Sequence, residues 1–367
     1  MRAALCHATG DPALEVVDDV EGSAPRPGEV TIDIKATGVC HSDLHAMEGA
    51  LPQPAPFIPG HEGAGVISAV GEGVTDLAVG DHVVVAWSPP CGSCNNCVER
   101  KQPHLCVMIQ FTIAGVPRFT RNGERVYGMA GMGTFAERLT VPEQAAIKIE
   151  DDVPFEIASL IGCGVSTGVG AAINTAKVRP GSSVVVFGCG GVGIAAIQGA
   201  RIAGAATIVA VDLQPAKLEQ AKTLGATHAC HPDDLAAVQA ELTGDGFDYA
   251  FEAIGLPATM RASYDAVHRG GTAVIVGVGG MDQQVSFNAF EIFFSEKAFL
   301  GSYYGSVDVR SDFHKLLKLW KSGQLDLDGM ITARGTIDDV NEAIQTMNRG
   351  EAIRTVLTFE DARVPAP

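Results

Sequence analysis

The sequence has 367 residues, with 26 Lys or Arg against 43 Asp or Glu, and a formal net charge of −17. Phosphate backbones and anionic membranes bind basic surfaces, so we expect neither nucleic acid nor membrane as the main partner. Hydrophobic residues make up 46% and charged residues 19% of the chain, which excludes a disordered protein and favours a compact soluble enzyme of two or three domains. No run of about 18 uninterrupted apolar residues predicts a membrane span.

The cysteines point to a reducing compartment. There are nine, an odd number, and residues 1–10 (MRAALCHATG) lack the apolar core of a secretory signal. Clustered cysteines in such a chain usually hold a metal and do not form disulfides. We therefore expect a cytoplasmic protein.

The predicted elements change character along the chain. Up to about residue 150, short apolar runs at 30–36, 65–70 and 81–86 predict strands separated by Gly and Pro turns. From residue 183, strands at 183–187, 207–212, 247–252 and 272–276 alternate with helices at 193–203, 216–224 and 260–268. This alternation predicts an α/β fold with a doubly wound parallel sheet. Helices at 313–321 and 337–349 and a strand at 355–359 follow.

A glycine-rich turn predicts a dinucleotide site. Gly188-Cys-Gly-Gly-Val-Gly193 fits G-x-G-x-x-G between a predicted strand and helix, and Asp212 ends the next strand. Such glycines let the backbone approach a pyrophosphate at the helix N-terminus. Asp212 can accept hydrogen bonds from ribose hydroxyls and would repel a 2′-phosphate, which favours NAD over NADP. The alternative is an ordinary strand–turn–helix with an exposed aspartate.

Four cysteines lie close together in the sequence: Cys91, Cys94, Cys97 and Cys106. Short turns between such cysteines let four thiolates converge on a tetrahedral Zn2+, which predicts a closed, structural site. The alternative is a set of reduced cysteines in an irregular loop.

A second group of metal-ligand residue types is dispersed: Cys40, His61, Glu62 and Cys163. Spacing alone does not bring these residues together. A lone histidine beside glycines is more often structural, and a lone buried cysteine usually only packs.

Taken together, these motifs resemble the zinc-dependent alcohol dehydrogenases of the medium-chain dehydrogenase/reductase superfamily, in their class I/III-like, long-loop form. The resemblance runs over nearly the whole chain. It includes Gly28-Glu-Val30, Gly60-His-Glu-Gly-Ala-Gly65, Gly162-Cys-Gly-Val-Ser-Thr-Gly168 and Ile353-Arg-Thr-Val-Leu-Thr358, in the family's order. One departure is the interval of eight residues between Cys97 and Cys106, where the family often has seven.

The resemblance implies two domains. A GroES-like, β-rich catalytic domain would comprise residues 1–164 and 301–367, with a structural zinc lobe at 88–108. An inserted NAD-binding Rossmann domain would comprise residues 165–300. The cleft between the domains would hold the nicotinamide and the catalytic zinc.

The resemblance also implies site roles. Cys40, His61 and Cys163 would bind the catalytic zinc, and the four clustered cysteines a second ion, so that each chain holds two. Asp43 would orient His61, Glu62 would approach the metal, and Ser42 and His45 would relay the alcohol proton to solvent. The implied cofactor-binding residues are His41, Thr167, Gly188, Gly190, Gly191, Val192, Gly193, Asp212, Lys217, Val276, Val278 and Arg354.

The implied activity is the reversible oxidation of a primary apolar or aromatic alcohol to the aldehyde, with hydride transfer to NAD. Leu51, Trp87 and Tyr303 would line an apolar substrate channel, and the chain would form a homo-oligomer, with a dimer favoured over a tetramer. An alternative within the family is S-(hydroxymethyl)glutathione dehydrogenase, although Leu51 and Gln110 stand where that branch has side chains that hold glutathione. An NADPH-dependent aldehyde reductase and a non-enzymatic dinucleotide-binding relative are further alternatives.

Overall fold

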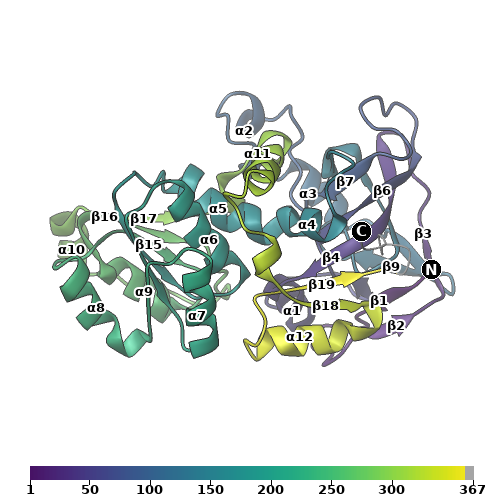
Figure 1. The fold of residues 1–367 in the computed structure, drawn as a ribbon. Helices are drawn as coiled ribbons and strands as arrows, with labels where there is room; N and C mark the ends of the chain where they lie inside the picture. The colour runs from purple at the N-terminus through teal and green to yellow at the C-terminus, as the bar shows by residue number, and fades with distance from the viewer. Residues whose placement is uncertain (360–367) are drawn as a thin grey trace. The chain divides into compact units, whose positions relative to one another are not determined.

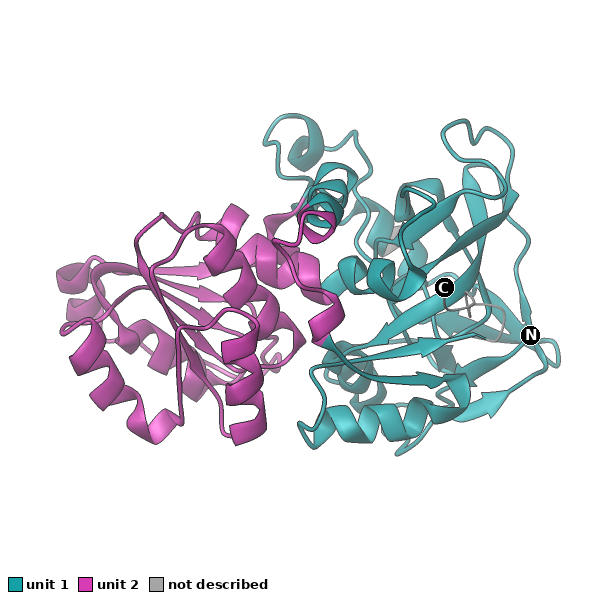
Figure 2. Ribbon diagram, viewed as in Figure 1, with its two compact units in different colours: residues 1–163, 308–318, 331–367 teal, residues 164–307, 319–330 magenta. Residues whose placement is uncertain are grey.

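The computed structural model of the protein describes residues 1–359, apart from the side chains of Phe111 and Thr112. By its internal contacts the chain divides into two units (Figure 2). Unit 1 comprises residues 1–163, 308–318 and the chain from Ile331 onward, and unit 2 comprises residues 164–307 and 319–330.

Unit 1 is built on a seven-stranded sheet in the order β11-β7-β6-β4-β19-β18, with β10 also pairing with β4. The bounds are β4 Glu29–Val39, β6 Glu62–Val70, β7 His82–Val85, β10 Arg138–Pro142, β11 Ala146–Lys148, β18 Ile331–Thr336 and β19 Arg354–Thr358. The long strand β4 pairs antiparallel with β6, β10 and β19, so early and late parts of the chain share one sheet (Figure 1).

The other elements of unit 1 are small. They are β1 Ala3–Leu5, β2 Glu15–Val17, β3 Val20–Gly22, β5 Phe57–Ile58, β8 Phe119–Arg121, β9 Glu124–Gly128, α1 His41–Glu48, α2 Asn95–Val98, α3 Met108–Ala114, α4 Phe155–Leu160, α11 Val309–Lys321 (which continues into unit 2) and α12 Val340–Asn348. Val30, Ile32 and Ile34 of β4 are buried in the core together with Phe57 and Phe119. Burial of such side chains stabilises the fold by about 1.5–3 kcal/mol each.

A buried ion pair ties β4 to the strand pair β8–β9. Arg118 Nη1 donates to Glu29 Oε1 at 2.6 Å, and the two side chains are 3% and 13% exposed. Burial by itself raises the pKa of Glu29, but the hydrogen bond and charge of Arg118 outweigh it and bring the pKa below its ordinary value of 4.5. The pair therefore stabilises the folded state above pH 4.5, and this contribution is lost as the pH falls through the lowered pKa.

We expect Arg118→Leu to lower the free energy of unfolding by about 3 kcal/mol at neutral pH, because it leaves a largely buried carboxylate without its partner. The deficit should shrink as the pH falls below 4.5. Urea denaturation at several pH values measures it. Arg138→Leu is the matched control, since its pair with Asp33 is exposed and should contribute at most about 1 kcal/mol. Equal losses in the two variants would contradict this prediction.

Unit 2 is built on a six-stranded parallel sheet in the order β14-β13-β12-β15-β16-β17. Its strands are β12 Ser183–Phe187, β13 Thr207–Val211, β14 His228–Cys230, β15 Phe247–Glu252, β16 Val267–Ile275 and β17 Ala298–Gly301. Its helices are α5 Ser166–Gly170, α6 Gly191–Ile202, α7 Pro215–Thr223, α8 Leu235–Leu242, α9 Pro257–Ala266 and α10 Ala289–Ser295. The chain order reverses at β12, which lies between β13 and β15, and such switch points are where doubly wound sheets bind ligands.

The predicted fold class is confirmed, and several predicted elements match closely. The strands at 183–187 and 247–252 have the predicted bounds. The helix expected at 260–268 begins at Pro257 and ends at Ala266, where β16 takes over. Helices α1 to α5, α8 and α10 were not predicted.

One helical stretch, Phe155–Thr175, is long and apolar enough to cross a membrane by length and composition. Its most apolar window is 89% buried inside the structure, and the core helix of a globular protein passes the same test. This stretch is glycine- and alanine-rich and includes Cys163.

Candidate functional site

The dispersed group is brought together within unit 1. One ligand atom from each of Cys40, His61, Glu62 and Cys163 lies within 4.8 Å of the others, and all four residues are buried. Cys40 directly precedes α1, His61 and Glu62 lie where β6 begins, and Cys163 follows α4. Spacing could not establish this convergence, because it depends on how β4, β6 and α4 pack together.

Asp43 orients this group through hydrogen bonds. Its fully buried carboxylate accepts hydrogen bonds from Cys40 N at 2.9 Å, Gly60 N at 3.1 Å and His61 Nδ1 at 2.9 Å. An ionised carboxylate only accepts, so Nδ1 donates and the lone pair of neutral His61 lies on Nε2. Nε2 is buried and makes no hydrogen bond within the described residues. This is the tautomer and orientation that a metal-binding imidazole requires.

Neighbouring groups also change the pKa values of Cys40 and His61. A hydrogen bond from Cys163 and interactions with His61 lower the pKa of Cys40 well below its usual range, against the effect of burial. Burial lowers the pKa of His61, but the charge and hydrogen bond of Asp43, together with Cys40, raise it to about 10. A metal that binds Nε2 must therefore displace a proton from His61, whereas Cys40 already favours the thiolate form that binds metals. Thiolate and imidazole ligands of this kind are typical of zinc sites.

Glu62 is paired with an arginine, although one of its carboxylate oxygens also lies within 4.8 Å of the ligand atoms of Cys40, His61 and Cys163. Its carboxylate forms an ion pair with Arg354 Nη2, and the two side chains are 0% and 4% exposed. Arg354 begins β19 and Glu62 begins β6, the two strands that flank β4 in this part of the sheet. With Glu62 paired to Arg354, two sulfurs and one imidazole would be left to bind a metal, and three protein ligands leave a position for water or substrate, as in catalytic zinc sites.

Other predicted residues lie around this group. Ser42 is half-buried, with its Oγ 3.8 Å from Cys40 Sγ. Trp87 stands edge-on to His61, with ring centroids 6.4 Å apart, and Trp87 and Leu51 pack against the core of unit 1. His45 is half-buried in the last turn of α1, and His41 is exposed at its first position.

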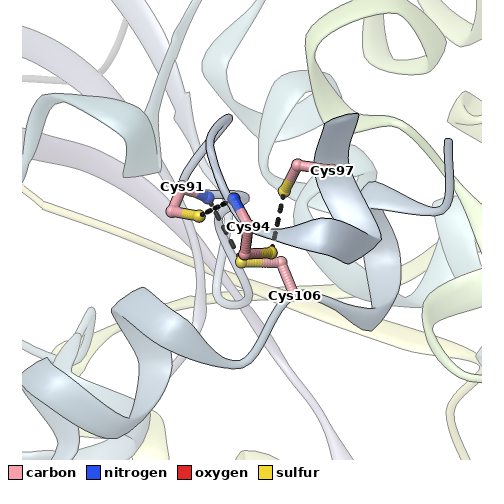
Figure 3. Close-up of side chains that lie close together, drawn as sticks. All are labelled: Cys91, Cys94, Cys97 and Cys106. Atoms are coloured by element: carbon pink, nitrogen blue, oxygen red, sulfur yellow. Dashed lines mark hydrogen bonds between the residues drawn. The ribbon is translucent and has the colours of Figure 1, made fainter. Parts of the chain in front are cut away.

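The four clustered cysteines also converge, and Figure 3 shows their side chains pointing toward one another. Their sulfurs lie within 4.8 Å of one another, so the longer interval before Cys106 does not keep that residue away. Cys94 N and Ser93 N donate to Cys91 Sγ at 3.3 and 3.4 Å, and Cys91 N donates to Cys106 Sγ at 3.3 Å. Hydrogen bonds from Ser93 lower the pKa of Cys91 to about 6, whereas burial raises that of Cys97 to about 12.

The glycine-rich turn of unit 2 has the geometry of a phosphate site. Gly188 has φ +90°, a conformation that favours glycine, and an added Cβ at Gly193 would overlap the Gly188 carbonyl oxygen. Gly190 caps α6 and has nothing within 4 Å of its Cβ position, so a ligand can approach its backbone. Asp212 accepts from Cys189 N at 2.7 Å and from Gln214 N at 2.9 Å, which fixes its carboxylate beside the turn.

The remaining predicted cofactor and substrate residues occupy varied positions in unit 2. Thr167 is buried in α5, and Val192 and Lys217 are half-buried in the first turns of α6 and α7. Val276 donates its N–H to Glu252 O at 2.8 Å, whereas Val278 and Tyr303 are 50% and 39% exposed.

Two residues near these sites were not predicted. Glu252 is fully buried at the end of β15, and its Oε1 accepts from Ile254 N, Gly255 N and Thr259 Oγ1. The sequence feature that could have indicated Glu252 is an acidic residue at the end of an apolar strand. The second is Gly38 of β4, which pairs with Glu62 of β6. The sequence does not indicate that the side chains of Glu62 and Arg354 occupy the space beside this glycine.

Comparisons with known proteins agree with this geometry. Residues 26–151 match the family model of the alcohol dehydrogenase GroES-like domain, and residues 191–322 that of the zinc-binding dehydrogenase. The chain is 40% identical over 370 aligned positions to an S-(hydroxymethyl)glutathione dehydrogenase of Synechocystis sp., with 98% of this chain and 99% of the relative covered. Relatives of the same name from Escherichia coli are also 40% identical.

Solved structures are similar over the same extent. An alcohol dehydrogenase zinc-binding domain protein from Burkholderia ambifaria has a TM-score of 0.91 at 34% identity, with 98% of each chain covered. Benzyl alcohol dehydrogenase from Acinetobacter calcoaceticus has a TM-score of 0.90 at 32% identity, with 98% of this chain and 99% of that chain covered.

Proposed function

Because the chain belongs to the zinc-dependent alcohol dehydrogenases of the medium-chain dehydrogenase/reductase superfamily, we propose that it oxidises primary aromatic or apolar alcohols to aldehydes, reversibly and with NAD. The observation that carries the proposal is the convergence of Cys40, His61 and Cys163, with His61 Nε2 presented by Asp43. Cys40, His61, Glu62 and Cys163, here called the metal group, would lie in a catalytic domain of residues 1–164 and 301–367. The dinucleotide would bind in residues 165–300.

The side chains of the site would have separate roles in the reaction. When bound, zinc supplies a Lewis acid that polarises the substrate oxygen and lowers the pKa of an alcohol. Cys40, His61 and Cys163 would hold it, and Asp43 keeps the imidazole in the binding tautomer. Ser42 offers a hydroxyl beside the metal group that can accept the alcohol proton, and His45, on the same helix, would pass that proton to solvent.

The aromatic substrate class is supported by what surrounds the metal group. Trp87 lies edge-on beside His61, and a polar substrate would leave hydroxyls unpaired against its ring. Leu51, which packs against the core of unit 1, would add apolar surface to the channel. The similar structure of a benzyl alcohol dehydrogenase supports the same class. The curated relatives named S-(hydroxymethyl)glutathione dehydrogenase favour a second candidate, oxidation of that thiol adduct.

A panel of substrates separates the two candidates. We expect kcat/KM with NAD to be highest for benzyl and other aryl or long-chain primary alcohols, and low for S-(hydroxymethyl)glutathione, ethanol and polyols. The cinnamyl aldehydes with NADPH test the reductase alternative. Preference for the glutathione adduct over benzyl alcohol would make the second candidate the function. No turnover in a preparation with two zinc ions per chain would overturn both.

The cofactor preference has its own test at Asp212. We expect Asp212→Ser to raise the ratio of NADP to NAD kcat/KM by about 10–100-fold, which corresponds to roughly 1.4–3 kcal/mol of removed charge repulsion. Asp212→Asn is the companion variant, because it removes the charge but keeps an oxygen for the Cys189 amide. If the ratio of NADP to NAD kcat/KM is unchanged in both variants, residues other than Asp212 determine the cofactor preference.

We further propose a cytoplasmic homodimer that associates through unit 2. The nine cysteines, all among the described residues, form no disulfide, which fits a reducing compartment. Phe290, Ile292, Phe293 and Phe294 of α10 are 52–79% exposed. Strand β17 ends the parallel sheet with one edge unpaired by any described strand, and its Phe299 and Leu300 are each 38% exposed. An exposed aromatic patch beside an open sheet edge is a surface that proteins usually cover.

We expect Phe293→Glu to convert the dimer into monomers, raising its dissociation constant at least about 100-fold, as the loss of a central aromatic contact does. Sedimentation velocity over a concentration series measures the change. Val79→Glu is the control, since Val79 is 63% exposed on unit 1, outside this patch. If both variants sediment like the wild type, α10 is not the contact surface.

A further inference from the structure

A glycine on β4 makes the space in which the buried ion pair of the metal group forms. Gly38 pairs with Glu62 of β6 on one side and with Val356 of β19 on the other, so it lies between the strands that carry Glu62 and Arg354. A Cβ added at Gly38 would overlap Glu62 Oε2 and lie 3.1 Å from Arg354 Nη2. The position of a single methyl group thus coincides with the junction of carboxylate and guanidinium.

The backbone itself does not call for glycine at this position. Gly38 is in regular β-strand and is not among the residues with positive φ, so its backbone conformation is open to any L-residue. A glycine in the interior of a strand also weakens the strand. What glycine supplies here is the space for the Glu62–Arg354 pair.

That space decides where the Glu62 carboxylate rests. One of its oxygens is already within 4.8 Å of the ligand atoms of Cys40, His61 and Cys163, while the carboxylate as a whole is paired with Arg354. If the room beside Gly38 were filled, the carboxylate would have to leave the guanidinium. An anion buried without its partner seeks another cation, and the nearest available one is a metal held by the neighbouring sulfurs and imidazole.

We propose that Gly38 is a positioning residue for the metal site: the missing side chain lets Arg354 hold Glu62, and so keeps the fourth coordination position open. The inference rests on the proposed function, because it takes the Cys40–His61–Cys163 group to be the catalytic zinc site. It adds a residue that touches neither metal nor substrate and acts only through Glu62.

Cobalt substitution with added imidazole tests this inference. In Gly38→Ala we expect imidazole to bind the cobalt-loaded site about tenfold more weakly, because the displaced carboxylate competes for the open position. The visible cobalt bands should also change in position and intensity, because a carboxylate oxygen replaces water as the fourth ligand. In the Glu62→Gln background, Gly38→Ala should change neither quantity, because a neutral amide competes poorly with imidazole. This non-additivity is the signature of action through Glu62.

Controls separate positioning from general damage to the fold. Gly63→Ala adds a methyl to the same strand pair, where it meets the side chain of Thr134 instead of the ion pair. It should alter stability but not the cobalt spectrum. Arg354→Met frees Glu62 by a second route and should reproduce the spectrum of Gly38→Ala, so the inference can be tested even if Gly38→Ala does not fold.

The outcomes are distinct. Equal effects of Gly38→Ala in both backgrounds, or an Arg354→Met spectrum like that of the wild type, would overturn the role of Gly38 and leave the proposed function intact. A wild-type protein that takes up only one metal ion per chain, at the four clustered cysteines, would overturn the proposed function and this inference together.

Discussion

Replacing Asp43 with Asn is expected to lower the affinity of the Cys40–His61–Cys163 group for zinc by about 10–100-fold, the range found for the outer partners of metal-binding histidines. Asp43 accepts three hydrogen bonds in a fully buried position, from Cys40 N, Gly60 N and His61 Nδ1. An amide cannot accept all three and brings two donors of its own. In the variant, His61 is free to adopt the other tautomer, with the proton on the atom that should bind the metal.

Metal content after dialysis against a graded chelator series measures the effect. Asp43→Asn should lose one of two zinc ions, and reloading it with excess zinc should recover turnover in part. Asp33→Asn is the control, because Asp33 is also paired within unit 1 but lies in an exposed contact with Arg138. A variant that keeps both ions at wild-type chelator resistance would contradict the role given to Asp43.

The dinucleotide turn was predictable because its information is local. A strand of β-branched residues, a glycine that needs positive φ, and an acid at the end of the next strand are all fixed by neighbouring residues in the sequence. The structure places Gly188, Gly190 and Asp212 as that pattern requires. The element ends differed slightly from the prediction: α6 runs from Gly191, within the motif, to Ile202, and β13 ends at Val211, one residue before Asp212.

The metal group could be predicted only through the resemblance. Its members come from three separate parts of the chain, and nothing near Cys163 in the sequence indicates that it meets Cys40. Hydrophobic periodicity could not predict α1 either, because this helix has only eight residues and most of them are polar. Its first turn is stabilised by the hydrogen bond from Cys40 N to the Asp43 carboxylate. The aromatic run in α10 shows a related difficulty, since exposed phenylalanines contradict the pattern expected of a helix in a monomer.

The role of Gly38 lay outside what any sequence pattern could show. With glycines making up 43 of the 367 residues, no single one is distinctive. Gly38 has no unusual backbone angle to single it out, so its importance depends on two side chains carried by other strands. The domain division and the individual site roles likewise remain predictions, to be tested by the variants described above.

The segment of residues 88–108 should depend on its metal for its structure. Neither α2 nor the turn Pro103–Leu105 contains a buried residue, and only Cys106 of the four cysteines is buried. Apart from residues 88–90 and Cys106, the loop has few buried contacts to offset its conformational entropy. A structural zinc contributes roughly 10–16 kcal/mol in small zinc domains, so the four sulfurs can provide the stabilisation that packing does not.

We therefore expect Cys97→Ser to remove one zinc ion per chain and to lower the free energy of unfolding by at least about 3 kcal/mol, a fraction of that contribution. Limited proteolysis should cut the variant within residues 88–108, where the wild type resists. Cys230→Ser is the matched control, since Cys230 is a buried thiol of unit 2 outside both sulfur groups. It should keep both ions and the protease resistance of the loop. If Cys97→Ser retains both as well, the loop must be held by contacts other than a tetrahedral metal.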